Sequence, residues 1–221
     1  MARERVVMSW SGGKDSAMAL REVLADDRYE VVALLTSLSA EFRRISHHGV
    51  REELLDAQAD ALGLRLDKLW LPACCSNDDY RALMRERMDA YLAEDVRTVV
   101  HGDLFLEDIR AFRERNLAEV GMRALFPIWG RDTAALARSF VRDGWGAILS
   151  FANRDLGVEF AGRHYDDVML DDLPAGIDPC GEYGEFHTYV FRGPILRREI
   201  PVAVGERVTR ETGHYAELLP A

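Results

Sequence analysis

Strand-like and helix-like segments alternate through the first half of the chain, and this order restricts the folds that it can adopt. Residues 6–8 and 31–35 are short, continuous runs rich in β-branched residues, as expected of strands covered on both faces, and residues 65–71 and 97–100 are expected to form further strands. Three segments between them carry apolar residues at helical spacing, and the second stops at Gly63, a residue suited to a helix C-cap. The sequence therefore predicts an α/β fold with a parallel sheet flanked by crossover helices.

The apolar stripes of these three helical segments are expected to face the core, without a functional role. Their members recur every three or four residues, as on one face of an α-helix. They are Ala17, Leu20 and Leu24 in the first segment, Val50, Leu54, Ala57 and Ala61 in the second, and Tyr80, Met84, Met88 and Tyr91 in the third.

The pattern changes after about residue 125. One further helix is expected with Asp132 as its N-cap, followed by an apolar, strand-like run over 147–151. A tract rich in Pro, Gly, Asp and Glu then spans 173–185. The last expected elements are two strands over 187–191 and 195–204, which we predict to pair antiparallel around a Gly-Pro turn.

Two domains follow from this division of a chain of 221 residues. Residues 1–128 are predicted to form the parallel α/β domain, and residues 129–221 a smaller α+β domain. The boundary is placed within about ten residues of position 128.

Composition favours a soluble cytoplasmic enzyme. No segment approaches the roughly 18 uncharged apolar residues of a membrane helix, and no membrane partner is expected. The three cysteines include no Cys-x-x-Cys pair and indicate reduced thiols. The formal net charge of −10 repels phosphate backbones, which makes a nucleic-acid partner unlikely by sequence. The oligomeric state is left open, with a homodimer as one possibility.

A glycine-rich loop joins the first predicted strand to the first predicted helix: Ser11-Gly12-Gly13-Lys14-Asp15-Ser16. A parallel sheet presents ligands at this place, the carboxyl ends of its strands. The paired glycines bring backbone N–H groups close to a polyanion, and the helix adds the positive end of its dipole. Lys14 supplies a full charge, and Ser11 and Ser16 supply hydroxyl donors. The loop therefore predicts a phosphate-binding site.

Asp15 is an unusual neighbour for phosphates, because two negative groups repel each other unless a metal lies between them. It therefore indicates Mg²⁺. Alternatively, Asp15 favours the first turn of the helix through the helix dipole, and the two roles can coexist. The loop matches neither the Walker pattern nor the dinucleotide fingerprint, which weakens the case for a γ-phosphate kinase.

A second polar cluster follows the strand that ends near His101. It begins with Gly102-Asp103 and continues with Glu107, Asp108 and Arg110. Three carboxylates and an arginine in so short a stretch can hold a metal, a ribose or the charged end of a substrate. An acidic, solvated helix start is the alternative explanation.

Five motifs in order resemble one known family. They are Ser-Gly-Gly-Lys-Asp-Ser near the start, His48-Gly49-Val50, Gly102-Asp103, Pro127-Ile128-Trp129-Gly130, and the tract Gly181-Glu182-Tyr183-Gly184-Glu185. The loop resembles the PP-loop of N-type ATP pyrophosphatases. The whole set resembles the diphthine–ammonia ligase family and its bacterial relatives within that superfamily.

This resemblance implies a HUP-like domain (adenine nucleotide alpha hydrolase-like) that binds ATP, followed by a smaller domain that helps to form the acceptor site. The implied reaction cleaves ATP between its α and β phosphates, activates a small-molecule or protein-borne carboxylate as its adenylate, and lets ammonia displace AMP. Catalytic roles are expected for Lys14, Asp15, Asp103, Glu185 and His187, with Mg²⁺ as a cofactor that stabilises the pyrophosphate leaving group together with Lys14. Expected ATP-binding residues are Ser9, Trp10, Ser11, Gly12, Gly13, Lys14, Asp15, Ser16, Thr36, Gly102 and Asp103. Expected substrate-binding residues are His48, Glu107, Asp108, Arg110, Trp129, Gly130, Arg131, Glu182, Gly184, Glu185 and Thr188.

Two of these residues have alternative explanations. His187 either shuttles a proton for an incoming amine or serves as a hydrogen-bonded strand histidine. Trp129 either stacks on a planar ligand or fills the core. The order Phe186-His187-Thr188 also departs from the aromatic-Glu-Thr order of archaeal and eukaryotic family members. The acceptor is thus either diphthine or another carboxylate.

Two other functions are compatible with a PP-loop. An RNA-modifying enzyme that adenylylates a base is disfavoured by the acidic charge and the lack of a Cys-x-x-Cys pair. A non-catalytic ATP-binding sensor is disfavoured by the elaborate polar tract of the second domain. An AMP-forming amide ligase is therefore the main functional prediction.

Overall fold

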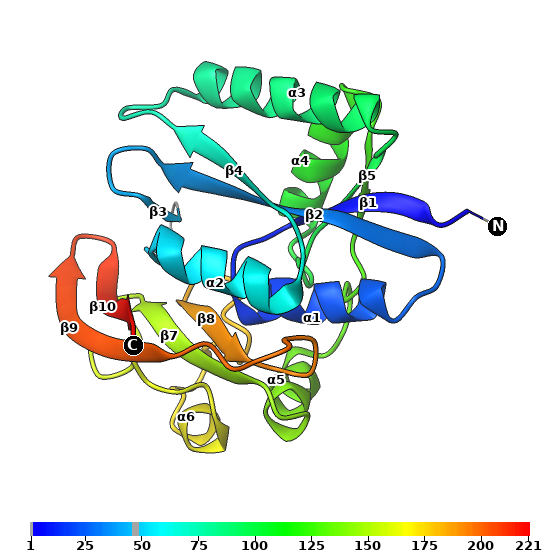
Figure 1. The fold of residues 1–221 in the computed structure, drawn as a ribbon. Coiled ribbons are helices and arrows are strands. Elements are labelled where there is room, and N and C mark those ends of the chain that lie inside the picture. The colour runs from blue at the N-terminus through cyan, green and yellow to red at the C-terminus, as the bar shows by residue number, and fades with distance from the viewer. Residues whose placement is uncertain (1, 46–48) are drawn as a thin grey trace.

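The first half of the chain forms a parallel sheet in the computed structural model, which describes residues 2–45 and 49–221 (Figure 1). The strands are β1 (Glu4–Ser9), β2 (Tyr29–Ser39), β4 (Leu66–Leu71), β5 (Thr98–Val100) and β6 (Arg123–Leu125). They are ordered β4-β2-β1-β5-β6, and all these pairs are parallel. The short β3 (Arg44–Ile45) pairs antiparallel with the end of β2. The predicted parallel sheet is confirmed, with β3 and β6 as strands that the sequence did not indicate.

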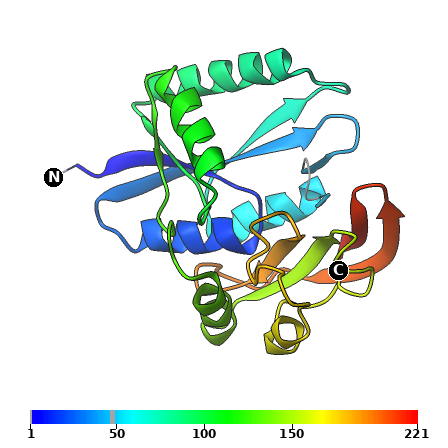
Figure 2. The same ribbon diagram turned by 180° about the vertical axis from the view of Figure 1, so that it is seen from behind.

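Helices cover both faces of this sheet. One pair, α3 (Asn77–Ala93) and α4 (Glu107–Ala118), lies on one side, and α1 (Lys14–Leu24) and α2 (Glu52–Leu62) lie on the other (Figures 1 and 2). Neighbouring residues of β1 accordingly enter different cores: Val7 packs under α3 and α4, while Val6 and Met8 face α1 and α2. Among the described residues, no helix is long and apolar enough to span a lipid bilayer.

The second half builds an antiparallel sheet beneath α1 and α2 (Figure 1). Its strands are β7 (Gly146–Ala152), β8 (Phe186–Arg192), β9 (Val202–Arg210) and β10 (Gly213–Pro220), in the order β8-β7-β10-β9. Two helices, α5 (Thr133–Arg142) and α6 (Asp167–Asp171), accompany it. The smaller α+β unit is thus confirmed, while α6 was not foreseen.

The predicted pairing of 187–191 with 195–204 is wrong. β8 pairs with β7 instead, and residues of β9 pair with β10. The chain between β8 and β9 turns at Gly193 and crosses to the end of α2, where the Arg197 N–H donates to the Ala61 carbonyl over 2.9 Å. The alternation of apolar and polar residues over 195–204 indicated a strand, but it did not identify the strand with which this segment pairs.

Two predicted helix boundaries are confirmed. Asp132 caps α5, because its side chain accepts a hydrogen bond from the Ala135 N–H over 2.7 Å. Gly63 ends α2 with φ of 69°, in the left-handed region where glycine carries no steric penalty. Two expected core residues are instead exposed: Leu24, the last residue of α1, is 48% exposed, and Tyr80 in α3 is 38% exposed.

Gln58 of α2 ties the two halves together. Its side chain is 1% exposed and donates to the Gly12 carbonyl (2.9 Å) and to the Val190 carbonyl of β8 (2.7 Å). Its oxygen accepts from the Trp10 indole N–H over 3.0 Å. One cluster of buried apolar side chains also continues from α1 and α2 into the second sheet. The division into domains at residue 128 stays a prediction.

Replacing Gln58 with leucine is expected to destabilise the whole chain. The variant removes three buried hydrogen bonds, each contributing roughly 0.5–1.5 kcal/mol, and leaves the Trp10 indole N–H without its acceptor at a further cost of roughly 1–3 kcal/mol. We expect the free energy of unfolding in urea to fall by about 3 kcal/mol or more. The control Asp60→Asn, on the exposed face of α2, should change it by less than about 1 kcal/mol. Equal stabilities of the two variants would contradict this role of Gln58.

Candidate active site

The glycine-rich loop lies where the two halves of the parallel sheet diverge. β1 is flanked by β2 on one side and β5 on the other, and the loop leaves the carboxyl end of β1. Ligands of open parallel sheets bind in the crevice at such a switch point. The cluster Gly102-Asp103 follows β5 and therefore lies beside the loop, as the sequence predicted.

Two glycines at this crevice are required by their surroundings. Gly12 has φ of 76°, and a Cβ atom there would lie 2.7 Å from the Gln58 side-chain oxygen. A Cβ atom at Gly102 would lie 2.8 Å from the backbone carbonyl of Asp15. The left-handed φ of Gly12 strains any other residue there, and at Gly102 a Cβ atom would require the backbone of Asp15 to shift.

The second sheet holds the loop in place. The Lys14 N–H, at the start of α1, donates to the Thr188 hydroxyl of β8 over 3.0 Å. The Val190 N–H, also from β8, donates to the Gly12 carbonyl over 2.9 Å. Gly13, the N-cap of α1, provides no side-chain cap. The loop and β8 therefore form one structural unit, although they are far apart in the sequence.

The Lys14 ammonium group points into the interface between the two halves. It is 2% exposed, pairs with the Asp15 carboxylate over 2.8 Å, and donates to the Cys180 carbonyl. The rings of Phe186 and Tyr165 lie 5.3 and 5.7 Å from it. Burial by itself lowers the pKa of Lys14, but the negative charge of Asp15 and its neighbours raises it overall. Lys14 thus remains charged and binds the polar tract of the second half.

That polar tract folds around carboxylates. Asp178 accepts from the N–H groups of Cys180 (3.2 Å) and Glu182 (2.9 Å), which shapes the turn. Glu185, buried beside it, accepts from the Asp178 N–H over 3.0 Å. Its other carboxylate oxygen is buried and has no hydrogen-bond partner within the described chain.

Glu182 connects this tract to the loop after β5. It accepts hydrogen bonds from the N–H groups of Leu104 (2.7 Å) and Phe105 (3.4 Å). Burial raises the pKa of Glu182 to about 7, and the negative charges of Asp15 and Asp103 add to the increase. The two N–H donors act in the opposite direction, but they do not cancel it. The carboxyl group therefore changes its charge near neutral pH.

These residues enclose a small cavity of about 240 Å³. Most of the predicted site residues line it, from both halves of the chain. They are Ser9, Ser11, Gly13, Lys14, Asp15, Ser16, Gly102, Asp103, Glu182, Gly184, His187 and Thr188.

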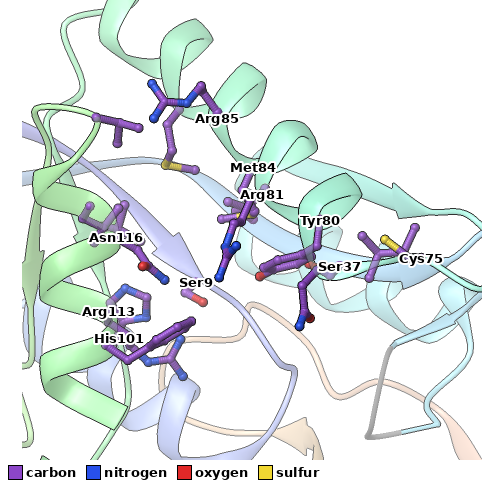
Figure 3. Close-up of a pocket in the computed structure, with 18 of the residues that line it drawn as sticks. Ser9, Ser37, Cys75, Tyr80, Arg81, Met84, Arg85, His101, Arg113 and Asn116 are labelled. Carbon is purple, nitrogen blue, oxygen red and sulfur yellow. The ribbon is translucent and has the colours of Figure 1, made fainter. Parts of the chain in front are cut away.

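A larger cavity of about 940 Å³ adjoins it, between the strand ends, α3 and α4 (Figure 3). Trp10 lines this cavity, as do Tyr80, Met84 and Met88, which were expected only to fill the core. The residues that line both cavities are Ser9, Ser11, His101, Arg113 and His187.

Several predicted residues lie away from both cavities. Thr36 is buried and donates to the Trp10 carbonyl, Gly12 lies in the loop backbone, and Glu185 supports the tract from within. Glu107 and Asp108 are exposed, and Arg110 stacks over the Trp129 ring at 4.7 Å. Gly130 and Arg131 are exposed, and Arg131 pairs with Glu22. His48 lies outside the described residues.

Sequence reasoning missed His101 and Arg113. His101 is 7% exposed, and neither ring nitrogen has a hydrogen-bond partner within residues 2–45 and 49–221. Burial lowers the pKa of His101 well below its ordinary value, and the charge of Arg113 adds to this. Arg113 also pairs with Asp103 over 2.9 Å. The position of His101 at the carboxyl end of a strand was a usable signal, whereas the orientation of Arg113 depends on how α4 packs.

His187, for which the sequence left two roles open, extends from β8 to the junction of the cavities and stacks on Phe151 with ring centroids 5.3 Å apart. It therefore has a structural contact and also faces the site. Over the described residues, no three histidine, cysteine or carboxylate side chains are grouped so as to hold a metal by themselves.

The fold and the site together define a HUP-like α/β protein whose PP-loop is closed by a second, antiparallel sheet. The chain belongs to the diphthamide synthase family. Family models match residues 4–124 (diphthamide synthase N-terminal domain) and residues 132–218 (diphthamide synthase C-terminal domain). The resemblance predicted from the sequence is thus confirmed.

Similar proteins include three named diphthine–ammonia ligase. The Danio rerio protein is 26% identical over 96% of this chain and 91% of its own length. The Homo sapiens protein is 25% identical over 96% of this chain and 88% of its own length. The Schizosaccharomyces pombe protein is 26% identical over 94% of this chain, which covers 38% of that longer protein.

The raised pKa of Glu182 predicts a pH-dependent stability. Because its folded pKa of about 7 lies above its ordinary value, its contribution to stability is full below about pH 4.5 and is lost as the pH rises through 7. Glu182→Gln keeps an acceptor for the Leu104 N–H but carries no charge. We expect the variant to gain about 2 kcal/mol relative to the native chain between pH 5 and 8. Urea unfolding at several pH values measures this gain, with Glu206→Gln on exposed β9 as the control, and parallel pH profiles for all three proteins would contradict the assignment.

Proposed function

We propose that this chain is an ATP-dependent ligase that forms an amide from a carboxylate and ammonia. The observation that carries the proposal is the phosphate-binding type of loop that β8 and the Gly-Glu tract close into a small polar cavity. Its relatives named diphthine–ammonia ligase support the same reaction class. The acceptor is either diphthine or another carboxylate.

In the proposed reaction, a carboxylate oxygen attacks the α-phosphorus of ATP, and the bond between the α and β phosphates breaks to release pyrophosphate. Ammonia then attacks the acyl carbon, the bond to AMP breaks, and a proton leaves the nitrogen. A carboxylate needs this activation because its own oxygen is a poor leaving group. The N–H groups at the start of α1 and the glycine backbone are suited to hold the phosphates.

Mg²⁺ fits the residues of the small cavity. One carboxylate oxygen of Asp15 is buried and has no hydrogen-bond partner among the described residues. Asp103 lies on the same cavity wall. Mg²⁺ is usually held by one or two carboxylates together with substrate phosphates, so a complete protein cage is not required. Bound there, the ion would offset the charge of the pyrophosphate leaving group.

Lys14 has a positioning role in this proposal. Its ammonium group is engaged by Asp15 and by the Cys180 carbonyl, so it acts by joining the loop to the tract. The two histidines among the residues that line both cavities, His101 and His187, face the place where a carboxylate and the α-phosphate can meet. We assign the handling of the ammonia proton to this junction.

The proposal predicts AMP and pyrophosphate as the products of ATP. The assay combines the protein with Mg²⁺, ATP, ammonium and a panel of carboxylic acids, and separates nucleotides by chromatography. Asp15→Asn should lower AMP formation at least about 100-fold, since it removes the charge that a metal needs. The control Asp171→Asn, on α6, should leave it unchanged. Release of ADP and phosphate, or full activity of Asp15→Asn, would overturn the proposal.

A further inference from the structure

The larger cavity extends beyond the strand ends into the space between α3 and α4 (Figure 3). Its volume of about 940 Å³ is near the upper end of the roughly 300–1,000 Å³ found for small-molecule pockets. Ser9, Ser11 and Ser37 line the part near the phosphate loop. Since α3 and α4 line much of the remainder, the cavity extends beyond the phosphate loop and has room for a second molecule beside a nucleotide.

Positive charge dominates the helical part of the wall. Arg81 and Arg85 come from α3, Arg113 comes from α4, and Glu119 is the one acidic residue of this wall in the described part of the chain. This excess of positive charge is confined to the cavity wall, since the chain as a whole has a formal net charge of −10. A cleft lined by one sign of charge concentrates ligands of the opposite sign.

The three arginines retain donors for a ligand. Arg81 forms one exposed contact, with Asp78 over 3.2 Å, and extends from α3 into the cavity in Figure 3. Arg85 has neither a hydrogen bond nor an ion pair with any described residue. Arg113 uses its Nε atom for Asp103, which leaves both Nη groups. Guanidinium groups of this kind bind carboxylate or phosphate oxygens.

Apolar side chains form the remaining surface between the helices. Met84 and Met88 of α3 face the same cavity as Leu117 of α4 and Val120, which follows that helix. Such a surface suits a carbon skeleton better than a phosphate chain. The ligand of this region therefore combines an apolar body with an anionic group.

His101 provides an independent sign of a ligand at the inner end of this cavity. It is 7% exposed, and both of its ring nitrogens lack a hydrogen-bond partner among the described residues. Buried polar groups are usually paired. Since His101 lines both cavities, a ligand at their junction would supply the missing partner.

We propose that the α3–α4 region binds the acceptor, and that this acceptor is a carboxylic acid with an apolar body and a second oxyanion at its far end. This inference rests on the function proposed above. The reacting carboxylate lies at the junction beside His101, the carbon skeleton lies against the methionines, and the second oxyanion pairs with Arg81 and Arg85. A cationic far end is excluded by the same arginines.

Three probes of equal length test the charge of the far end: octanedioate, octanoate and 8-aminooctanoate. Each is titrated calorimetrically into the full chain with Mg²⁺ and saturating α,β-methylene-ATP, whose bridge is not cleaved. Octanedioate is expected to bind about fivefold more tightly than octanoate, and 8-aminooctanoate most weakly, because ion pairs in a partly exposed site contribute about this much. In the variant Arg81→Gln/Arg85→Gln, the advantage of octanedioate should fall below about twofold.

The control variant Arg115→Gln/Arg142→Gln removes the same charge from exposed positions outside the cavity and should keep the native preference. The inference is wrong if none of the probes binds, if 8-aminooctanoate binds most tightly, or if the Arg81/Arg85 variant keeps the native preference. Because the analogue is not cleaved, this result is independent of which products ATP yields. Failure of the inference is therefore distinguishable from failure of the proposed function.

Discussion

The hydrogen bonds between β8 and the phosphate loop are the constraint on which the rest of the site depends. The loop offers its backbone to a ligand, but two of its own groups, the Gly12 carbonyl and the Lys14 N–H, are bound by Val190 and Thr188 of the second sheet. A glycine-rich loop has many accessible conformations. Contacts from β8 and from Gln58 select one of them, so the second half of the chain completes the site that the first half begins.

Charged side chains surround the contact between β8 and the phosphate loop. Asp15, Asp103 and Glu182 bring negative groups close together, and burial together with their mutual repulsion raises the pKa of Glu182 to about 7. Lys14 offsets part of this charge from within the interface. Farther out, Arg81, Arg85 and Arg113 line the larger cavity. An acidic protein thereby presents a positive wall on one side of a site and clustered carboxylates on the other.

The sequence predicted the parallel sheet, the phosphate loop and the neighbourhood of Gly102-Asp103, because strand-to-helix corners of a parallel sheet meet at one edge. It could not predict which side chains turn toward that edge from a distance. Arg113 faces the cavity, whereas the predicted Arg110, three residues before it, stacks on Trp129. Lys14 looked like a phosphate ligand from its position in the loop, yet its ammonium group lies against Cys180, a contact made across 166 residues.

The sequence also predicted the wrong partner strand for β8, which pairs with β7 and not with the segment 195–204. Alternation of apolar and polar residues in 195–204 has the local pattern of a strand, but pairing is decided by tertiary packing, which directs Arg197 to the end of α2 and pairs the start of β9 with β10. Local patterns therefore identified elements better than they identified contacts between elements. The site is built mainly from such contacts, which explains why the larger cavity was not foreseen.

The most direct test of this account is the affinity of the chain for Mg²⁺-ATP when the hydrogen bond from the Lys14 N–H to Thr188 of β8 is removed. Thr188→Val preserves the size of a buried side chain but deletes the acceptor of the Lys14 N–H. Calorimetry should show an affinity at least about tenfold weaker than that of the native chain, equivalent to about 1.4 kcal/mol. Thr209→Val on exposed β9 should bind as the native chain does. A folded Thr188→Val protein with native affinity would contradict the claim that the second sheet completes the phosphate site.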